Sequence, residues 1–282
     1  MIRQQSFSNE KPTLYLVPTP IGNLDEMTPR AIEVLKSVDV IAAEDTRNTM
    51  KLLQVFDIHT RLIAHHAHNE RESAKGLLQL LQQGQSVAVV SDAGYPLISD
   101  PGQKLVEQVT EAGYNVVPLS GSSASLNALV ASGLKAQPFL FHGFLPGNDR
   151  ECVRELERLK SMPVTLIFYE APHRIRRMLE HCLHVLGDRR ACLAREMTKK
   201  HEEFLRGTLS ELVQAAEELR GEIVVVVEGA EPASSPAIDM GRITELVNER
   251  IALGMSASQA IRAVAQENGV SKNEVYRAYH QE

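Results

Sequence analysis

The sequence predicts an α/β protein of two domains, with a parallel-rich sheet in the first and a mixed sheet in the second, followed by a small helical domain. Three observations predict it. Apolar runs of strand length alternate with segments of helical periodicity over residues 13–136, which is typical of a mainly parallel sheet. Strands continue over residues 137–230, but two of them follow each other without a helix. After residue 240 only helical periodicity remains.

The first half alternates between strands and helices. Strands are expected at Thr13–Val17, Val40–Ala43, Arg61–Ala64, Ser86–Val90 and Asn115–Leu119. Helices are expected from Pro29 to about Val38 and at Thr46–Phe56, Glu70–Gln82, Pro101–Ala112 and Ser122–Ser132. Thr28 suits a helix cap and Pro29 the first helical position, while Gly84 and Gly113 suit helix ends. The continuous apolar run of Ser86–Val90 indicates a strand buried on both faces of a parallel sheet.

The second half begins near Phe139–Phe141 and the turn Gly143–Gly147. Its further strands are expected at Val164–Tyr169, Ala191–Ala194, Glu203–Arg206 and Glu222–Glu228, and its helices at Arg150–Lys160, Ala171–Leu186 and Ser210–Leu219. Because no helix separates residues 191–194 from residues 203–206, this part of the sheet is expected to be antiparallel.

The domain limits follow from these elements. Residues 1–12 are expected to be disordered or extended, residues 13–136 to form the first α/β domain, and residues 137–230 to form the second, which completes a ligand cleft. The composition of Glu231–Pro236 predicts a linker over residues 231–239. Residues 240–282 are expected to form three helices, Ile243–Leu253, Ser256–Asn268 and Ser271–His280, with a Gly-Val-Ser turn that resembles a helix-turn-helix. This module could contact nucleic acid or serve only for packing.

Composition and charge exclude several classes of protein. A net charge of −6 argues against a nucleic-acid binder that works by general basicity, although residues 171–200 form a local basic stretch. The three cysteines, Cys152, Cys182 and Cys192, fit neither a zinc ribbon nor a redox pair. The chain contains no apolar run long enough to span a membrane, and its N-terminus is polar, so a cytoplasmic protein is expected.

Three loops that follow apolar strands are rich in Gly, Pro and Ser: Pro18–Leu24, Ser91–Gly102 and Ser120–Ser125. In open α/β sheets, ligands bind beyond the carboxyl ends of the strands. Glycines allow the backbone to approach a ligand, and prolines fix the shape of a loop. The loops therefore predict a ligand site. They contain neither GxGxxG nor GxxxxGK[ST], which disfavours dinucleotide-binding and P-loop enzymes.

Charged residues at strand ends supply further candidates. Glu44, Asp45 and Arg47 stand at a strand-to-helix junction, where they could form either a helix cap with an ion pair or a site facing the substrate. His65, His66 and His68 lack the accompanying ligands of a metal site, so exposed histidines are expected there.

Seven stretches occur in an order that resembles a known family: LYLVPTPIGNLDEMTPRAIEVLKSVDVIAAEDTRNT, VAVVSDAGYPLISDPG, VVPLSGSSASLNAL, FLFHGFLP, TLIFYEAPHRI, AREMTKKHEEFLRGTL and GEIVVVVEG. They cover nearly all of residues 13–229. The chain resembles the tetrapyrrole-methylase-like (class III) methyltransferases, and within them the members that act on small-subunit ribosomal RNA. The tail stretch GVSKNEVYR also resembles those members. One departure is Tyr95, which stands where a small residue or Thr is expected.

The resemblance implies the fold, the cofactor and the reaction. It implies a two-domain fold, a homodimer, and transfer of a methyl group from S-adenosylmethionine to the ribose 2′-hydroxyl of a cytidine in the decoding region of 16S ribosomal RNA, either naked or in the assembled subunit. No metal is needed. The cofactor-binding residues implied by position are Pro20, Ile21, Gly22, Ala93, Gly94, Tyr95, Ile98, Ser122, Ser123, Ala124, Phe168, Tyr169, Ala194 and Gly229.

The residues themselves leave the catalytic base open. The candidates are Glu44, Asp45, Asp92 and Asp100, and the candidates for RNA phosphate contacts are Arg47, Arg174, Arg195, Lys199 and Lys200. Two other functions stay open. One is a tetrapyrrole-type methylase with a small-molecule substrate, and the other is a nonenzymatic RNA-binding assembly factor.

Overall fold

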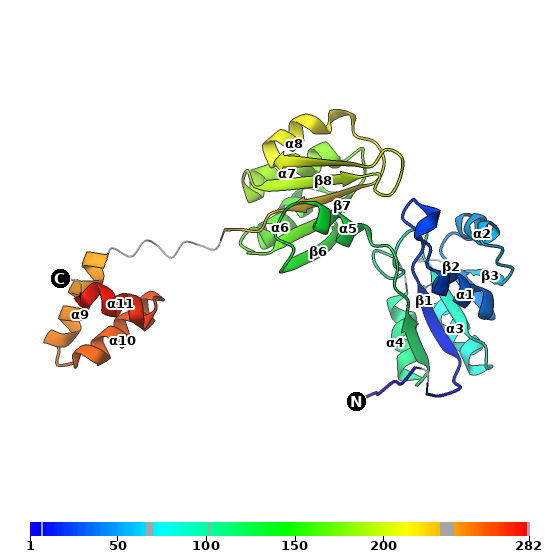
Figure 1. Cartoon of the computed structure of the whole chain (residues 1–282), viewed down its shortest axis with the longest axis horizontal. Coiled ribbons are helices and arrows are strands. Elements are labelled where there is room, and N and C mark those ends of the chain that lie inside the picture. The colour runs from blue at the N-terminus through cyan, green and yellow to red at the C-terminus, as the bar shows by residue number, and fades with distance from the viewer. Residues whose placement is uncertain (7, 66–69, 101, 232–239, 281–282) are drawn as a thin grey trace. The chain divides into compact units, whose positions relative to one another are not determined.

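Two five-stranded sheets form the larger part of the protein (Figure 1). The computed structural model describes the chain except for residues 7, 66–69, 101, 232–239 and 281–282. The chain divides into two units, Met1–Gly229, which holds both sheets, and Ala230–Glu282, which is helical. Each unit is described by itself below.

The first sheet is entirely parallel, as the sequence predicts. Its strands lie in the order β3-β2-β4-β1-β5, and every pairing among them is parallel. The strands are β1 (Thr13–Val17), β2 (Val40–Ala43), β3 (Arg61–Ala64), β4 (Val87–Val90) and β5 (Asn115–Pro118). Their carboxyl ends consequently meet at one edge of the sheet, which is where the small-residue loops begin.

Helices cover both faces of this sheet. Helices α1 (Pro29–Ser37) and α2 (Thr46–Val55) bury Leu35 and Leu53 against one face, while α3 (Glu70–Gln82) and α4 (Gln103–Glu111) bury Leu77 and Leu105 against the other. The start of α1 is fixed locally, because the Thr28 hydroxyl accepts a hydrogen bond from the Ala31 N–H at 3.1 Å.

The N-terminal residues lie along the edge strand β5. Gln4 exchanges two hydrogen bonds with the backbone of Val116, donating from Nε2 at 2.9 Å and accepting at Oε1 at 2.9 Å. The ammonium of Lys11 donates to the carbonyl of Gly113 at 2.8 Å. These contacts pair backbone groups of an edge strand that would otherwise be open.

The second sheet is mixed. Its order is β6-β7-β10-β8-β9, with β6 and β7 parallel and the other pairs antiparallel. The strands are β6 (Phe139–Phe144), β7 (Thr165–Glu170), β8 (Arg190–Arg195), β9 (Glu203–Thr208) and β10 (Ile223–Val227). The antiparallel pairing predicted for residues 191–194 and 203–206 is confirmed. Because β10 is antiparallel to both neighbours, it begins at the edge where β7 and β8 end.

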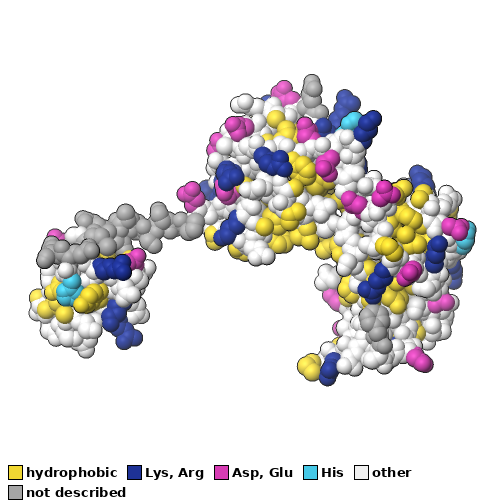
Figure 2. All heavy atoms as spheres, in the orientation of Figure 1, with side chains coloured by type: hydrophobic (Ala, Val, Ile, Leu, Met, Phe, Trp, Pro, Cys, Tyr) yellow, Lys and Arg dark blue, Asp and Glu magenta, His cyan; other side chains and the backbone are white. Residues whose placement is uncertain are grey.

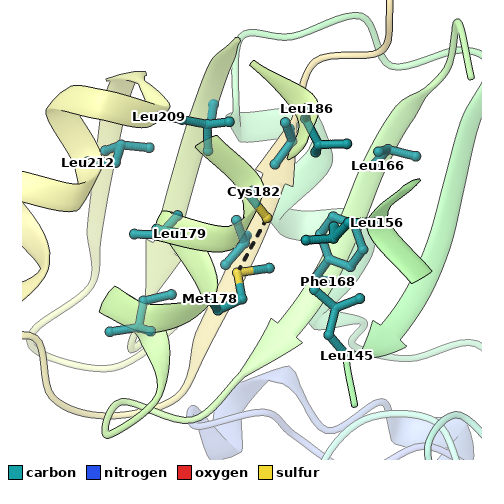
Figure 3. Close-up of a cluster of buried hydrophobic side chains, with 14 of the residues drawn as sticks. Leu145, Leu156, Leu166, Phe168, Met178, Leu179, Cys182, Leu186, Leu209 and Leu212 are labelled. Carbon is teal, nitrogen blue, oxygen red and sulfur yellow. Dashed lines mark hydrogen bonds between the residues drawn. The ribbon is translucent and has the colours of Figure 1, made fainter. Parts of the chain in front are cut away.

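One face of the second sheet carries the main hydrophobic core (Figure 3). Leu166 and Phe168 of β7 pack there against Leu156 and Cys182, which come from α6 (Asp149–Leu159) and α7 (Ile175–Leu186), and α8 (Leu209–Ala215) completes this layer. All three cysteines are buried free thiols. On the opposite face, α5 (Ala124–Ala131), the helix that follows β5, packs against β7 and β10.

Beyond small shifts of helix ends, three differences between the observed and the predicted helices stand out. The helix expected from Ala171 begins at Ile175, because the carboxylate of Glu170 binds the Ala171 N–H at 2.8 Å and the chain first makes a turn. The helix expected over Ser210–Leu219 divides into α8 and a 3-10 helix, η3 (Ala216–Glu218). A second 3-10 helix, η1 (Leu24–Glu26), was not predicted.

The helical unit contains α9 (Met240–Ala252), α10 (Ala257–Asn268) and α11 (Lys272–His280), close to the three predicted helices. Its core is separate from that of the sheets and includes Ile243, Ile261, Val264 and Val275. Gly269 ends α10 with a φ of +64°, a conformation that favours glycine. Most of the predicted linker lies outside the described residues. Within the described part of the chain, every helix falls short of the length and apolarity that crossing a membrane requires.

Candidate active site

The three small-residue loops are joined by hydrogen bonds at the carboxyl edge of the first sheet. Thr19 of the first loop and Gly94 of the second exchange two backbone hydrogen bonds, both of 3.0 Å. The Gly121 N–H of the third loop donates to the Tyr95 hydroxyl at 3.1 Å. The tyrosine that departs from the family pattern therefore links the second loop to the third.

The second loop has an unusual backbone. Leu97 and Ser99 adopt φ angles of 71° and 68°, which lie in the left-handed region. Such conformations cost about 1–3 kcal/mol per residue and are concentrated at functional sites. The loop is held from within, since the Ser91 hydroxyl donates to the carbonyl of Gly94 at 2.7 Å.

A cavity of about 890 Å³ lies between these loops and the second sheet. This volume is within the range of about 300–1,000 Å³ that is typical of small-molecule sites. The aromatic rings of Phe141, Phe144 and Tyr169 form one wall, and the Tyr169 ring centroid lies 4.9 Å from that of Phe141 and 5.7 Å from that of Phe144. The loops line another part of the cavity, and the start of α5, at Ala124, packs beside the aromatic rings.

Eight of the residues predicted to bind the cofactor line this cavity: Ile21, Ala93, Gly94, Tyr95, Ile98, Ser123, Ala124 and Tyr169. Pro20 and Gly22 instead line a smaller cleft beside it. The Ser122 hydroxyl donates to Glu26 at 2.9 Å, and Ala194 is fully buried against α5.

Phe168 and Gly229 lie away from the cavity for reasons of strand geometry. Successive side chains of a strand point to opposite faces, so Tyr169 faces the cavity while Phe168 enters the core on the helix side. Gly229 follows the end of β10, whereas the start of β10, at Ile223 and Val224, reaches the cavity. A Cβ on Gly229 would lie 2.5 Å from the backbone nitrogen of Val164, so this glycine serves close packing.

The sequence did not single out several lining residues, among them Phe141, Phe144, Glu170, Glu196, Gly221 and Glu222. Gly221 is a glycine whose backbone conformation and close neighbour both exclude a side chain. It has a φ of +85°, and a Cβ there would lie 2.2 Å from a carboxylate oxygen of Glu196, so only glycine fits without displacement. This glycine lies just before β10, and the start of β10 reaches the cavity.

Two of the four candidate bases, Asp92 and Asp100, line the cavity. Burial, together with the nearby charges of Glu44 and Asp92, raises the pKa of Asp100 from 3.8 to about 6. Asp45 has another role. It caps α2 by accepting from the Arg47 N–H at 2.9 Å, and hydrogen bonds from Arg47 lower its pKa to about 2.

Comparison with known proteins identifies the family. The model for tetrapyrrole (corrin/porphyrin) methylases matches residues 13–213. The chain belongs to this methylase family. It is 48% identical to "Ribosomal RNA small subunit methyltransferase I" of Bacillus subtilis (strain 168), over 99% of this chain and 98% of the relative. It is 46% identical to the protein of the same name from Halalkalibacterium halodurans, over the full length of both chains.

Solved structures of low sequence identity share the fold of the methylase. Uroporphyrin-III-C-methyltransferase from Thermus thermophilus superposes with a TM-score of 0.54 at 18% identity, covering 77% of this chain and 94% of that one. Diphthine synthase superposes with a TM-score of 0.59 at 13% identity, covering 77% and 90%. The predicted tetrapyrrole-methylase-like fold is confirmed.

The predicted cofactor, S-adenosylmethionine, is that of the family, and the cavity suits it. Its volume admits a ligand of this size, and its apolar wall can cover the flat adenine ring. The carboxylates of Asp100, Glu170 and Glu196 also line the cavity. Asp100 is suited to the positive charge of a sulfonium or an ammonium group, whereas Glu170 and Glu196 already bind Arg174 and Lys199. The sequence had pointed to the loops but not to these glutamates.

The candidate RNA-binding cations fall into two groups. Arg174 binds Glu170 at 3.3 Å, Arg195 pairs with Glu203, and Lys199 binds Glu196 at 3.1 Å. Lys200 is exposed, and so is Arg47, although its guanidinium binds Asp45. Cations and carboxylates are interspersed over the face of the Met1–Gly229 unit that Figure 2 shows.

The histidines after β3 differ from the expectation. His65 is buried rather than exposed, and its Nδ1 lies 2.6 Å from the Ser73 hydroxyl. It therefore belongs to the packing between the end of β3 and α3. His66 and His68 lie outside the described residues. In the described part of the chain, no three His, Cys, Asp or Glu side chains are grouped so as to hold a metal ion.

Proposed function

We propose that the chain methylates the ribose 2′-hydroxyl of a cytidine in the decoding region of small-subunit ribosomal RNA. The observation that carries this proposal is the match over nearly the whole chain, at 46–48% identity, to relatives named as small-subunit ribosomal RNA methyltransferases. The cavity and its half-buried carboxylate at Asp100 supply the chemistry that the reaction needs.

Positioning is the first contribution of the protein. When bound, the cofactor supplies a methyl group on a sulfonium. A neutral thioether is a good leaving group when an oxygen displaces it from the methyl carbon in line. The interlinked loops hold one side of the cavity in a fixed shape, and the aromatic wall excludes water from the other. Holding two reactants in the correct geometry can supply on the order of 7–11 kcal/mol of the barrier.

Asp100 is the base that we propose. A ribose hydroxyl is a weak nucleophile at neutral pH, and a positioned base accelerates such a reaction by roughly 10²–10⁴-fold. With a pKa of about 6, Asp100 is mostly ionised at pH 7, yet it is a better proton acceptor than an ordinary carboxylate. Asp92 and Glu44 assist by raising this pKa, and Asp45 is occupied as a helix cap.

Lys200 and Arg47 are the phosphate contacts that we propose. Both are exposed, although Arg47 also binds Asp45, whereas Arg174, Arg195 and Lys199 are partly buried and bind carboxylates close to the second sheet. Replacing Lys200 with Ala should reduce the slope of log affinity for RNA against log salt by about 1. An unchanged slope would exclude Lys200 from contact with phosphate.

We also propose that the protein works as a homodimer, as the family resemblance implies. Exposed apolar side chains on the sheet-bearing unit support this proposal, since Val130 and Phe139 expose 75% and 41% of their surface. Sedimentation equilibrium at micromolar concentration should give twice the mass of the chain, and a monomer at these concentrations would refute the proposal.

One experiment tests the main proposal. The protein is incubated with S-adenosylmethionine labelled in its methyl group and with naked ribosomal RNA, assembled small subunits or a porphyrinogen extract. Label is expected in RNA or in subunits, at one nucleotide whose 3′ linkage resists alkali because its 2′-oxygen is blocked. Label in the extract would favour a small-molecule methylase. The absence of label in every arm would favour a nonenzymatic RNA-binding protein.

A further inference from the structure

A second, smaller cleft of about 250 Å³ borders the cofactor cavity. It lies between the first small-residue loop and α2, and Asp92 lines both hollows. Its volume falls below the range of about 300–1,000 Å³ that is typical of drug-sized ligands, so the cleft suits a single ring system rather than a whole cofactor. Its lining residues include Pro20, Gly22, Leu24, Asn48, Lys51 and Val55.

Part of the wall of this cleft is apolar and exposed. Leu24 of η1 exposes 44% of its surface and Val55 of α2 exposes 59%. Leu52, which lies one turn before Val55, also lines the cleft. Apolar side chains that face each other across a concave surface indicate a site for a flat apolar face rather than for an ion alone.

Part of the lining of the cleft is polar. Asn48 donates a hydrogen bond from Nδ2 to a carboxylate oxygen of Asp92 at 3.1 Å. This bond orients the side-chain amide and leaves its carbonyl oxygen and second N–H for another partner. An amide can pair side by side with the edge of a nucleobase by accepting one hydrogen bond and donating another. Cytosine offers such an edge, with an amino group next to a ring nitrogen.

Positive charge stands at the rim. Lys51 lies one helical turn after Arg47 on α2 and is exposed. Among the described residues, Lys51 forms no ion pair with a carboxylate, which leaves its ammonium available to a phosphate. A small cleft that combines apolar side chains with an exposed ammonium and an oriented amide matches a nucleotide better than it matches a peptide or a free anion.

We propose that this cleft holds the cytosine base of the target nucleotide, with Asn48 reading its edge and Lys51 contacting a neighbouring phosphate. The inference rests on the proposed RNA methylation. A base in this cleft places its ribose next to Asp92, at the boundary with the cofactor cavity. Asn48 and Val55 thereby become residues that determine specificity, and uracil is disfavoured because it offers a carbonyl where cytosine has an amino group.

The test compares cytidine with uridine at the target nucleotide. The acceptor is the RNA, or the assembled subunit, that the unmodified protein labels. It is prepared in two versions, with cytidine or with uridine at the labelled position. The unmodified protein should prefer cytidine roughly tenfold or more in kcat/KM. Asn48→Ala should bring this ratio close to one. Asn48→Ala also removes the hydrogen bond to Asp92. Any general effect of this loss lowers the rate equally with both acceptors, so the ratio of the two rates reports on recognition of the base.

Steric block of the cleft provides the second arm. Val55→Phe fills the cleft from an exposed position and should lower kcat/KM for the cytidine acceptor roughly tenfold. Gln54→Phe, its exposed neighbour on α2 outside the cleft, is the matched control and should behave as the unmodified protein. The affinity for S-adenosylmethionine, measured by calorimetry, should stay unchanged in all three variants.

The outcomes separate the two proposals. If the unmodified protein labels no RNA, the proposed function fails and this inference fails with it. Two results would exclude the base from the cleft and leave the proposed function standing. In the first, the unmodified protein labels RNA without preferring cytidine. In the second, Asn48→Ala keeps the preference and Val55→Phe keeps full activity.

Discussion

Asp100 is the residue whose ionisation decides whether the cavity can accept a proton. If it is the base, Asp100→Asn should lower kcat by roughly 10²–10⁴-fold, because the hydroxyl then loses its proton acceptor. In the unmodified protein, kcat should rise with pH through about 6 and level off above it, since the carboxylate is the active form. Single-turnover rates over pH 5–8 measure both effects. A rate that does not change across this range would remove Asp100 from this role.

The same carboxyl group should affect stability in the opposite direction. Its pKa is raised from 3.8 to about 6 on folding, so at pH values between these the unfolded chain releases the proton and the folded protein keeps it. The free energy of unfolding therefore falls as the pH rises from about 4 to about 6, and the loss is complete above that. Asp100→Asn should consequently raise Tm at pH 7 while leaving it nearly unchanged at pH 4. An equal Tm at pH 7 would show that burial does not perturb the group.

At the level of elements, the contact between loops is fixed by a glycine. A Cβ on Gly121 would lie 2.6 Å from the Pro18 side chain, whose ring cannot rotate away. Gly121→Ala should destabilise the protein by about 1–3 kcal/mol and should weaken cofactor binding roughly tenfold, since it separates the first and third loops. Gly76→Ala in α3 is the control, because a Cβ there meets nothing within 4 Å. It should stabilise the protein by about 0.5–1 kcal/mol and leave cofactor binding unchanged. Similar effects of the two substitutions would contradict this account.

Local sequence signals predicted the elements well, and they failed where partners are distant in sequence. Gly, Pro and Ser after apolar strands correctly marked three loops that meet, because the carboxyl ends of parallel strands share one edge. The family resemblance implied Gly229, at the end of β10, whereas the pairing of β10 with β7 and β8 brings its start, at Ile223, to the cavity. Alternation along β7 shows that Phe168 and Tyr169 point to opposite faces of the second sheet. It cannot show which of the two faces the cavity until the face that packs against α6 and α7 is known.

The ion pairs of the basic stretch are partly local and partly distant in the sequence. Glu170 and Glu196, which bind Arg174 and Lys199, stand within four residues of them, so local spacing could have suggested these two pairs. Arg195 and Lys199 also bind Glu203 and Glu222, which lie 8 and 23 residues further along the chain, and only the fold brings these residues together. The smaller cleft escaped notice for a similar reason, because it requires η1 and α2 to face each other.

At the level of the whole molecule, the helical unit has a core of its own. Val264 is fully buried in that core, so Val264→Asp places an unpaired charge there and should unfold this unit. The sheet-bearing unit should keep its affinity for S-adenosylmethionine, because the residues that line the cavity of about 890 Å³ belong to it. Circular dichroism and calorimetric titration measure the two effects. Loss of cofactor binding in this variant would show that the two units depend on each other for folding.

Calorimetric titration of S-adenosylmethionine into two variants of α5 tests most directly whether the cavity is the cofactor site. Ala124 lines the cavity, whereas Val130, on the same helix, is exposed and does not. Ala124→Phe should weaken binding roughly a hundredfold or more, because the ring occupies the volume that the cofactor needs. Val130→Phe should bind as the unmodified protein does. Equal affinity in Ala124→Phe and the unmodified protein would contradict the account, because the cofactor would then bind elsewhere.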